Sequence, residues 1–134
     1  PLNTVGTSNY HFYYPETPAN KNFVKEFEAA YQRKPAVGAL YGYLAARYII
    51  EGYQKAGKVD SEKLIDAIEG MTVDSPVGKV TLRAYDHQAL LPMFLGVTAS
   101  DPAYPDFLIA KDIVTVPGAE LVLSVEEVKK LRGE

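Results

Sequence analysis

One change of residue pattern constrains the fold most: apolar residues follow a helical spacing as far as residue 71 and alternate with polar residues beyond it. The first part predicts three helices after an N-terminal strand, and the second part predicts strands and then a last helix. The strands are expected at residues 5–14, at 90–97 and at 107–116, and a β-hairpin or a single strand is expected around residues 80–82, after a turn at Ser75-Pro76 and Gly78. The helices are expected at residues 18–34, 39–56 and 61–69 and from residue 124. This order predicts a mixed α/β fold.

Several predicted helix ends carry specific capping residues. Asn20 is a plausible N-cap for the first helix, and Gly57 suits the left-handed position that follows the second. Asp60 or Ser61 is expected to cap the third helix. Ser124 with a glutamate three residues later forms a capping-box pattern at the start of the last helix.

Composition excludes several classes of function. The chain has 134 residues, a net charge of -3 and no Lys/Arg cluster, so it suits a single domain that does not bind nucleic acid. It has no cysteine, which excludes disulfides, thiolate metal sites and a cysteine nucleophile. The two histidines have no metal-binding spacing, and no loop resembles a phosphate cradle, so no metal and no cofactor are expected. The chain starts at Pro1 without Met, so we expect it to be a piece of a longer protein.

Asp86, His87 and Gln88 form a polar run just before an apolar segment. A histidine beside a carboxylate can serve as a general base. Adjacent residues on a strand point to opposite faces, however, so Asp86 is poorly placed to orient the His87 ring. The pattern favours a turn whose polar side chains bond to the backbone.

Tyrosines form the second candidate site, in the stretches SNYHFYYPETP and ALYGYLAARY. The first contains Tyr10 and Tyr13 at a strand end, where ligands of α/β proteins often bind. The second contains Tyr41 and Tyr43 near a helix N-terminus, where backbone N–H groups favour a carboxylate. The alternative is that these tyrosines only pack the helix against its neighbours.

Three stretches resemble a known family in their order and spacing: PETPANKNFVKEFEAAYQRKP, YGYLAARYIIEGYQKAGKVDSEKLIDAIEGM and DSPVGKVTLRAYDHQALLPMFLGV. The matching positions are Pro18-Ala19-Asn20, Phe23, Tyr43-Leu44-Ala45, Ala56-Gly57, Asp60, Lys63-Leu64, Ala67-Ile68, Ser75-Pro76, Gly78, Val80, Arg83 and Asp86-His87-Gln88. On these residues the chain resembles the C-terminal part of the type I periplasmic solute-binding proteins, in the branched-chain amino-acid branch of the ABC importers.

The resemblance implies two α/β lobes joined by crossover strands, with a small-molecule solute enclosed between them and no catalysis. It implies a periplasmic protein, or an extracellular lipoprotein anchored to the membrane, that delivers its solute to an ABC permease. Residues 1–15 would be a C-terminal-lobe segment with the first crossover, and residues 16–97 would belong to the N-terminal lobe. Residues 98–134 would contain the second crossover and return to the C-terminal lobe. The missing N-terminal part, or a second copy bound through free strand edges, would complete the fold.

The resemblance also assigns roles to the candidate residues. Asp86, His87 and Gln88 become a structural turn, and the solute contacts fall first on Tyr41 and Tyr43 and then on Tyr10 and Tyr13.

The solute is expected to be bulkier than leucine, and aromatic. Many amino-acid binders of this family have a large aromatic side chain just before the second helix. This chain has Gly38, Ala39 and Leu40 there, which form a smaller wall.

Two other functions stay open. One is a cytoplasmic ligand-sensing regulator of the same fold, and the other is an unrelated α/β enzyme that would depend on His87.

Overall fold

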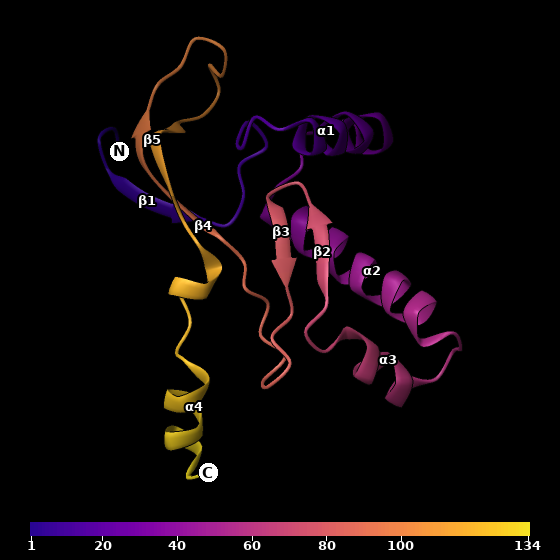
Figure 1. The fold of residues 1–134 in the computed structure, drawn as a ribbon. Helices are drawn as coiled ribbons and strands as arrows, with labels where there is room; N and C mark the ends of the chain where they lie inside the picture. The colour runs from indigo at the N-terminus through magenta and orange to yellow at the C-terminus, as the bar shows by residue number, and fades with distance from the viewer.

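The computed structural model describes all residues from Pro1 to Glu134, and its elements fall into two groups (Figure 1). A three-stranded antiparallel sheet has the order β1-β4-β5, and helices α1–α3 with the hairpin β2-β3 lie beside it. The strands are β1 (Val5–Ser8), β2 (Thr72–Ser75), β3 (Gly78–Thr81), β4 (Met93–Ala99) and β5 (Ile109–Val116). The helices are α1 (Pro18–Tyr31), α2 (Val37–Ala56), α3 (Ser61–Ile68), the short 3₁₀ helix η1 (Gly118–Glu120) and α4 (Val125–Arg132).

The sheet joins the two ends of the sequence. Strand β4 lies in the middle, with Ser8 of β1 opposite Phe94 on one side and Thr115 of β5 opposite Phe94 on the other. The register of β4 and β5 shifts between Leu95 and Val97. A shift of this kind marks a β-bulge, which bends the strand locally.

The predicted strands form in the predicted order, including the hairpin β2-β3, but several of their bounds differ. Residues 9–14 are not part of the N-terminal strand, because that segment turns back on itself: the Tyr14 N–H donates to the His11 carbonyl at 2.9 Å. Strand β4 begins at Met93, after Pro92, which has no N–H for a strand ladder. Strand β5 begins two residues later than predicted, at Ile109.

The helices form where the spacing predicted them, and two of the predicted ends among α1–α3 are right. Gly57 takes the left-handed conformation after α2, with φ 73°. Asp60 caps α3 by accepting from the Lys63 N–H. The prediction for Asn20 is wrong, because Thr17 is the N-cap of α1 and its hydroxyl accepts from the Asn20 N–H at 3.1 Å. Pro18 occupies the first helical position, which favours Pro and leaves the cap to the residue before it.

The core lies between α2 and the hairpin β2-β3. One face of α2 carries Leu40, Leu44 and Tyr48 at a spacing of four residues, and all three are buried. The Tyr48 hydroxyl donates to the Val80 carbonyl at 2.7 Å. Fully burying a side chain such as Leu40 contributes about 1.5–3 kcal/mol. No helix is both long enough and apolar enough to span a membrane.

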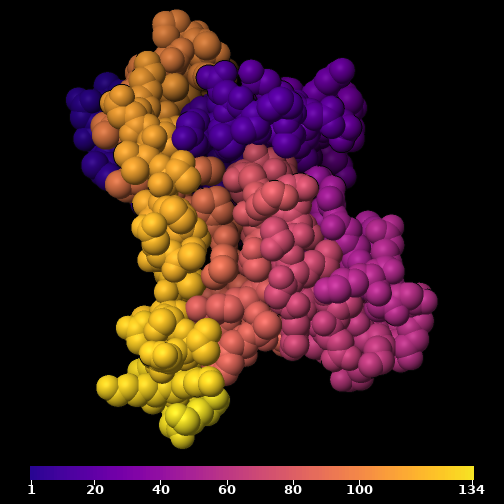
Figure 2. All heavy atoms as spheres, in the orientation of Figure 1, coloured from indigo at the N-terminus to yellow at the C-terminus, as the bar shows by residue number.

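The last helix, α4, projects from the rest of the molecule (Figure 2). The predicted capping box is confirmed, with Ser124 and Glu127 each accepting from the other's backbone N–H. None of the α4 residues is buried. Two cations, Lys129 and Arg132, each lie 5.4 Å from the Tyr85 ring, so α4 reaches back to the segment after β3.

Candidate ligand-binding site

The polar run before β4 forms a turn and not an acid–base pair. The Arg83 N–H donates to the Gln88 carbonyl, and the Arg83 guanidinium pairs with the Asp86 carboxylate. This hydrogen-bonded ion pair lowers the pKa of Asp86 to about 2. The His87 ring meets a different carboxylate, Glu69, at 2.9 Å. Asp86 therefore does not orient His87, and neither residue lies beside the cavity described next.

A cavity of about 400 Å³ lies where three distant segments meet. Its walls come from the loop after β1, the turn between α1 and α2, and the end of the loop between β4 and β5. The lining residues are Ser8, Tyr10, His11, Phe12, Tyr13, Lys34, Pro35, Ala36, Val37, Phe107 and Leu108. Most of these side chains are apolar or aromatic, as in many small-molecule sites. The hollow is shallow and open on one side, which suits half of a site that a second surface closes.

Phe107 lines the cavity on the side of the β4–β5 loop, and Tyr104, which does not line it, packs beside Phe107. The Tyr104 ring centre lies 5.5 Å from that of Phe12 and 5.5 Å from that of Tyr13. The Phe107 ring lies 5.9 Å from Phe12 and 5.6 Å from Tyr104. Ring pairs at such distances attract each other beyond their apolar contact. Figure 2 shows this loop in contact with the N-terminal third of the chain.

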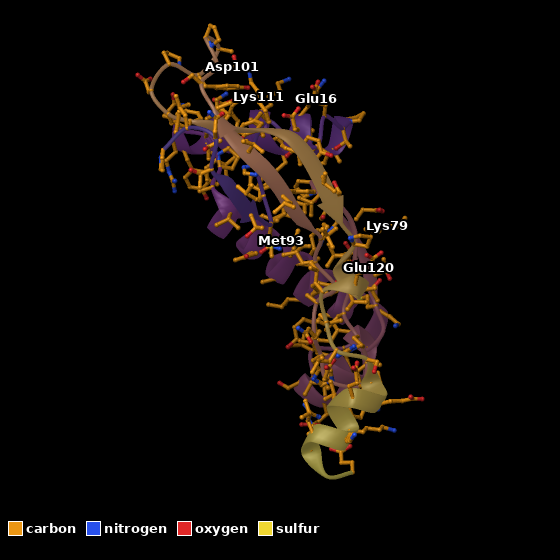
Figure 3. The ribbon with its side chains drawn as sticks, turned by 90° about the vertical axis from the view of Figure 1, so that its left-hand side faces the viewer. Glu16, Lys79, Met93, Asp101, Lys111 and Glu120 are labelled. Atoms are coloured by element: carbon orange, nitrogen blue, oxygen red, sulfur yellow. The ribbon has the colours of Figure 1, made fainter.

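An ion pair secures the base of the same loop. Lys111 of β5 lies 3.2 Å from the Asp101 carboxylate, and Figure 3 shows both residues at one end of the molecule. The second Asp101 oxygen accepts from the Ala103 N–H at 2.9 Å. These bonds hold the start of the loop, so the aromatic residues that follow are presented to Phe12.

The opposite wall is held in place by Asn20, which is only 1% exposed. Its Nδ2 donates to the Phe12 carbonyl at 3.1 Å and to the Pro15 carbonyl at 3.0 Å. Its Oδ1 accepts from the Tyr10 hydroxyl at 3.0 Å. A single side chain of α1 therefore fixes the backbone of the aromatic segment on both sides of Tyr13.

The charged group in the wall is a cation. Lys34 Nζ lies 5.4 Å from the centre of the Phe12 ring and 2.7 Å from the Glu28 carboxylate. Glu28 does not line the cavity, and no other carboxylate does. Because Glu28 pairs with Lys34, the wall carries a compensated cation and no unpaired carboxylate.

The structure places two of the predicted tyrosines at this cavity. Tyr10 is buried, and its hydroxyl is engaged with Asn20, so it supports the wall from behind. The Tyr13 hydroxyl accepts from the Ala110 N–H at 2.8 Å. Burial is the main reason why the pKa of Tyr13 is raised, so its phenol stays neutral.

The other two predicted tyrosines do not line the cavity. The Tyr41 hydroxyl donates to Asn9 Oδ1 at 2.8 Å on an exposed surface. Tyr43 packs against Phe23 with ring centres 5.2 Å apart and accepts from Arg47 Nη1. Positions two apart on a helix do not share a face, which is why α2 separates these side chains. Their contact with a solute stays a prediction.

Four lining residues were not predicted from the sequence: His11, Phe12, Lys34 and Phe107. The first two lie between the predicted tyrosines and were within reach of the same argument. Lys34 was interpreted only as a helix end, and nothing local connects residue 107 with residue 12.

The expected small wall is only partly present. Gly38 and Ala39 lie inside the first turn of α2, and a Cβ atom at Gly38 would meet no atom within 4 Å. Leu40 is fully buried in the core and forms no wall.

Comparison with known proteins identifies the family. The family described as periplasmic binding protein matches residues 2–101, and the chain therefore belongs to this family. A curated relative is the leucine-, isoleucine-, valine-, threonine- and alanine-binding protein of Pseudomonas aeruginosa. It is 31% identical over 67 residues, which cover 50% of this chain and 18% of the relative.

Solved structures agree with this assignment. An ABC-type branched-chain amino acid transporter protein of Rhodopseudomonas palustris CGA009 matches with a TM-score of 0.81 and 31% identity, over 92% of this chain and 33% of its own. A solute-binding protein of an ABC transporter from Rhodopseudomonas palustris BisB5, in complex with 3,4-dihydroxybenzoic acid, matches with a TM-score of 0.78 and 21% identity, over 94% of this chain and 33% of its own. The fold is thus part of the type I periplasmic binding protein fold, as predicted. The chain spans about a third of the length of these solved relatives.

Proposed function

We propose that this chain is the C-terminal portion of an extracytoplasmic solute-binding protein, which captures a small molecule between two lobes and delivers it to an ABC import permease. The observation that carries the proposal is the match of 92% of the chain to one third of a branched-chain amino acid transporter protein. The open aromatic hollow supports it, because half of an enclosed site has this shape. The protein acts by binding and not by catalysis. It lies in the periplasm or is itself a lipoprotein anchored to the membrane.

The path of the chain supports a division into two lobes. It leaves the sheet after β1 to form helices α1–α3 and the hairpin, and it returns to the sheet at β4 (Figure 1). Because β1 and β4 pair directly, the outgoing and returning passages lie side by side. We assign residues 1–15 to the C-terminal lobe and the helices and hairpin that follow to the N-terminal lobe. Because β4 pairs with both β1 and β5, we move the second boundary from residue 97 to the segment 82–92 and assign the chain from β4 onward to the C-terminal lobe.

The solute we propose is an amino acid or an aromatic carboxylic acid, with the flat aromatic acids favoured. The aromatic wall around Phe12 suits a planar ring, and no carboxylate lines the cavity to repel an acid.

Titration calorimetry on the full-length protein tests the proposal, with leucine, phenylalanine, benzoate and 4-hydroxybenzoate as probes. At least one aromatic probe is expected to bind, and Phe12→Ala is expected to weaken that binding by about tenfold or more, because a ring contact is lost. Tyr31→Ala is the matched control, since Tyr31 is an exposed aromatic residue outside this cavity. Binding of leucine alone would contradict the aromatic preference, and binding of none of the probes would contradict the solute class.

Cell fractionation separates the importer from the cytoplasmic regulator. An importer protein is expected in the periplasmic fraction or, as a lipoprotein, with the membrane. Recovery of the full-length protein only from the cytoplasm would favour the regulator.

A further inference from the structure

His11 is a polar group of the cavity that the proposed function leaves unassigned. Its ring stacks on that of Tyr13, with centroids 5.1 Å apart and an angle of 18° between the planes. The Phe94 ring lies 6.3 Å away on the core side. His11 is half-buried, and burial lowers its pKa, so the imidazole is neutral at neutral pH. A neutral imidazole carries one N–H, and its position decides what His11 offers a ligand.

The neighbouring hydrogen bonds indicate which nitrogen carries the proton. The Tyr13 oxygen accepts from the Ala110 N–H at 2.8 Å, and His11 Nδ1 lies 3.3 Å from the same oxygen. If Nδ1 carried the proton, two donors would point at the phenol oxygen and the phenol's own proton would have no acceptor in the protein. If Nδ1 is bare, the chain of donors runs from Ala110 N–H to Tyr13 O–H to His11 Nδ1, and each donor has an acceptor.

The second arrangement leaves a proton on Nε2. This nitrogen makes no hydrogen bond within the chain, whereas the corresponding nitrogen of His87 lies 2.9 Å from Glu69. His11 is therefore a half-buried donor, without a partner of its own, in the wall of an aromatic cavity.

We propose that His11 is a specificity-determining residue whose Nε2–H donates a hydrogen bond to an anionic oxygen, a carboxylate, of the bound solute. The inference rests on the proposed function and narrows its solute class. Among the lining residues no Asp or Glu is present to hold an ammonium group, and the one cation, Lys34, is already paired with Glu28 outside the cavity, so His11 is the donor left for an anionic oxygen. The end of the solute that faces this chain is therefore its carboxylate.

The state of His11 is measured first, by nitrogen NMR on the full-length protein at neutral pH without solute. The Nε2–H tautomer is expected in a higher proportion than in a free histidine, which itself favours it, and Tyr13→Phe is expected to return the proportion to the free-histidine level, because the proton that Nδ1 accepts is removed. A dominant Nδ1–H tautomer or an imidazolium in the unaltered protein would overturn the inference, whatever the protein binds.

Solute binding is measured next, with the best of the four probes above and its carboxamide, in which the anionic oxygen is replaced. His11→Phe keeps a ring and removes the donor, so the carboxylate is expected to bind about tenfold more weakly or worse, since a hydrogen bond to a charged group contributes about 1.5–3 kcal/mol. The carboxamide is expected to lose much less. His11→Gln, which returns an N–H donor, is expected to restore part of the affinity.

The control is His87→Phe, which removes an exposed histidine outside the cavity and is expected to leave affinity unchanged. Equal carboxylate affinity in the His11→Phe variant and the unaltered protein would overturn the role of His11 while leaving the proposed function intact. If the unaltered protein binds none of the probes, the proposed function fails and the solute role of His11 fails with it. In that case the tautomer measurement still tests whether the Tyr13 hydroxyl donates to His11 Nδ1.

Discussion

Asn20→Ala tests how the aromatic segment is held against α1. Asn20 is almost fully buried, and its amide makes hydrogen bonds with three groups of the segment that precedes α1. Truncation removes the acceptor of the Tyr10 hydroxyl and the donor of the Phe12 and Pro15 carbonyls. None of these contacts belongs to a regular helix or strand, so no backbone ladder replaces them.

The magnitude follows from the burial of each group. The Tyr10 hydroxyl is buried, and leaving such a donor without an acceptor costs about 1–3 kcal/mol. The two carbonyls are bonded in partly buried positions, where water can replace part of the lost contact, so each contributes about 0.5 kcal/mol. We expect Asn20→Ala to lower the free energy of unfolding by about 3 kcal/mol, a large share of the about 5–15 kcal/mol typical of a folded protein.

Urea denaturation of the full-length protein measures this loss. Asn22→Ala is the matched control, because Asn22 lies on an exposed part of the same helix and bonds only to Glu26; its cost is expected to stay below about 0.5 kcal/mol. Adding Tyr10→Phe to Asn20→Ala removes the hydroxyl that lost its acceptor, so the double variant should be more stable than the sum of the single losses by about 1 kcal/mol. If Asn20→Ala unfolds at the same urea concentration as Asn22→Ala, the amide does not hold the segment and the argument is refuted.

Two further predictions concern the segment around β4. Asp86 has a pKa of about 2 in the fold against an ordinary 3.8, so its bond with Arg83 stabilises the fold above the ordinary value and is lost as pH falls through about 2. Asp86→Asn should therefore be less stable at neutral pH and lose less stability on acidification, as measured by the urea midpoint at several pH values; parallel pH curves would contradict this. A Cβ at Gly118 would lie 2.2 Å from the Leu90 backbone, whereas one at Gly6 meets nothing. In the same assay, Gly118→Ala is expected to lower the free energy of unfolding by more than about 2 kcal/mol and Gly6→Ala by less than about 0.5 kcal/mol. Equal losses would show that the backbone near Leu90 moves to make room for the new side chain.

Short-range patterns explain most of what was predicted correctly. The end of α2 at Gly57 and the capping box of Ser124 depend on residues within one turn, so the sequence is sufficient to find them. The backbone of the turn at Asp86 is also set locally, because the Asp86 bonds and the bond from the Arg83 N–H to the Gln88 carbonyl join residues at most five positions apart. The family resemblance depended on the same kind of information, that is, on the order and spacing of local motifs.

The candidate site required longer-range information. Its walls are joined by the pairing of β1 with β4 and of β4 with β5, which brings residues about one hundred positions apart into contact. Asn20 is a residue type that suits a helix cap. Its actual role, bonding to Tyr10, Phe12 and Pro15, depends on the segment before α1 packing over this helix. Tyr41 and Tyr43 are two positions apart in sequence and are directed to different partners by the turn of the helix.

By itself, the sequence determined the class of fold, the number and order of the helices, and the family, since hydrophobic spacing and capping are set by near neighbours. Only the tertiary structure decided which aromatic side chains share a cavity. It also decided that Tyr10 is buried with its hydroxyl bonded to Asn20, and that His11 keeps an N–H donor without a partner. The physical reason is that a side chain's burial and hydrogen-bond partners are set by segments that meet only when the sheet closes.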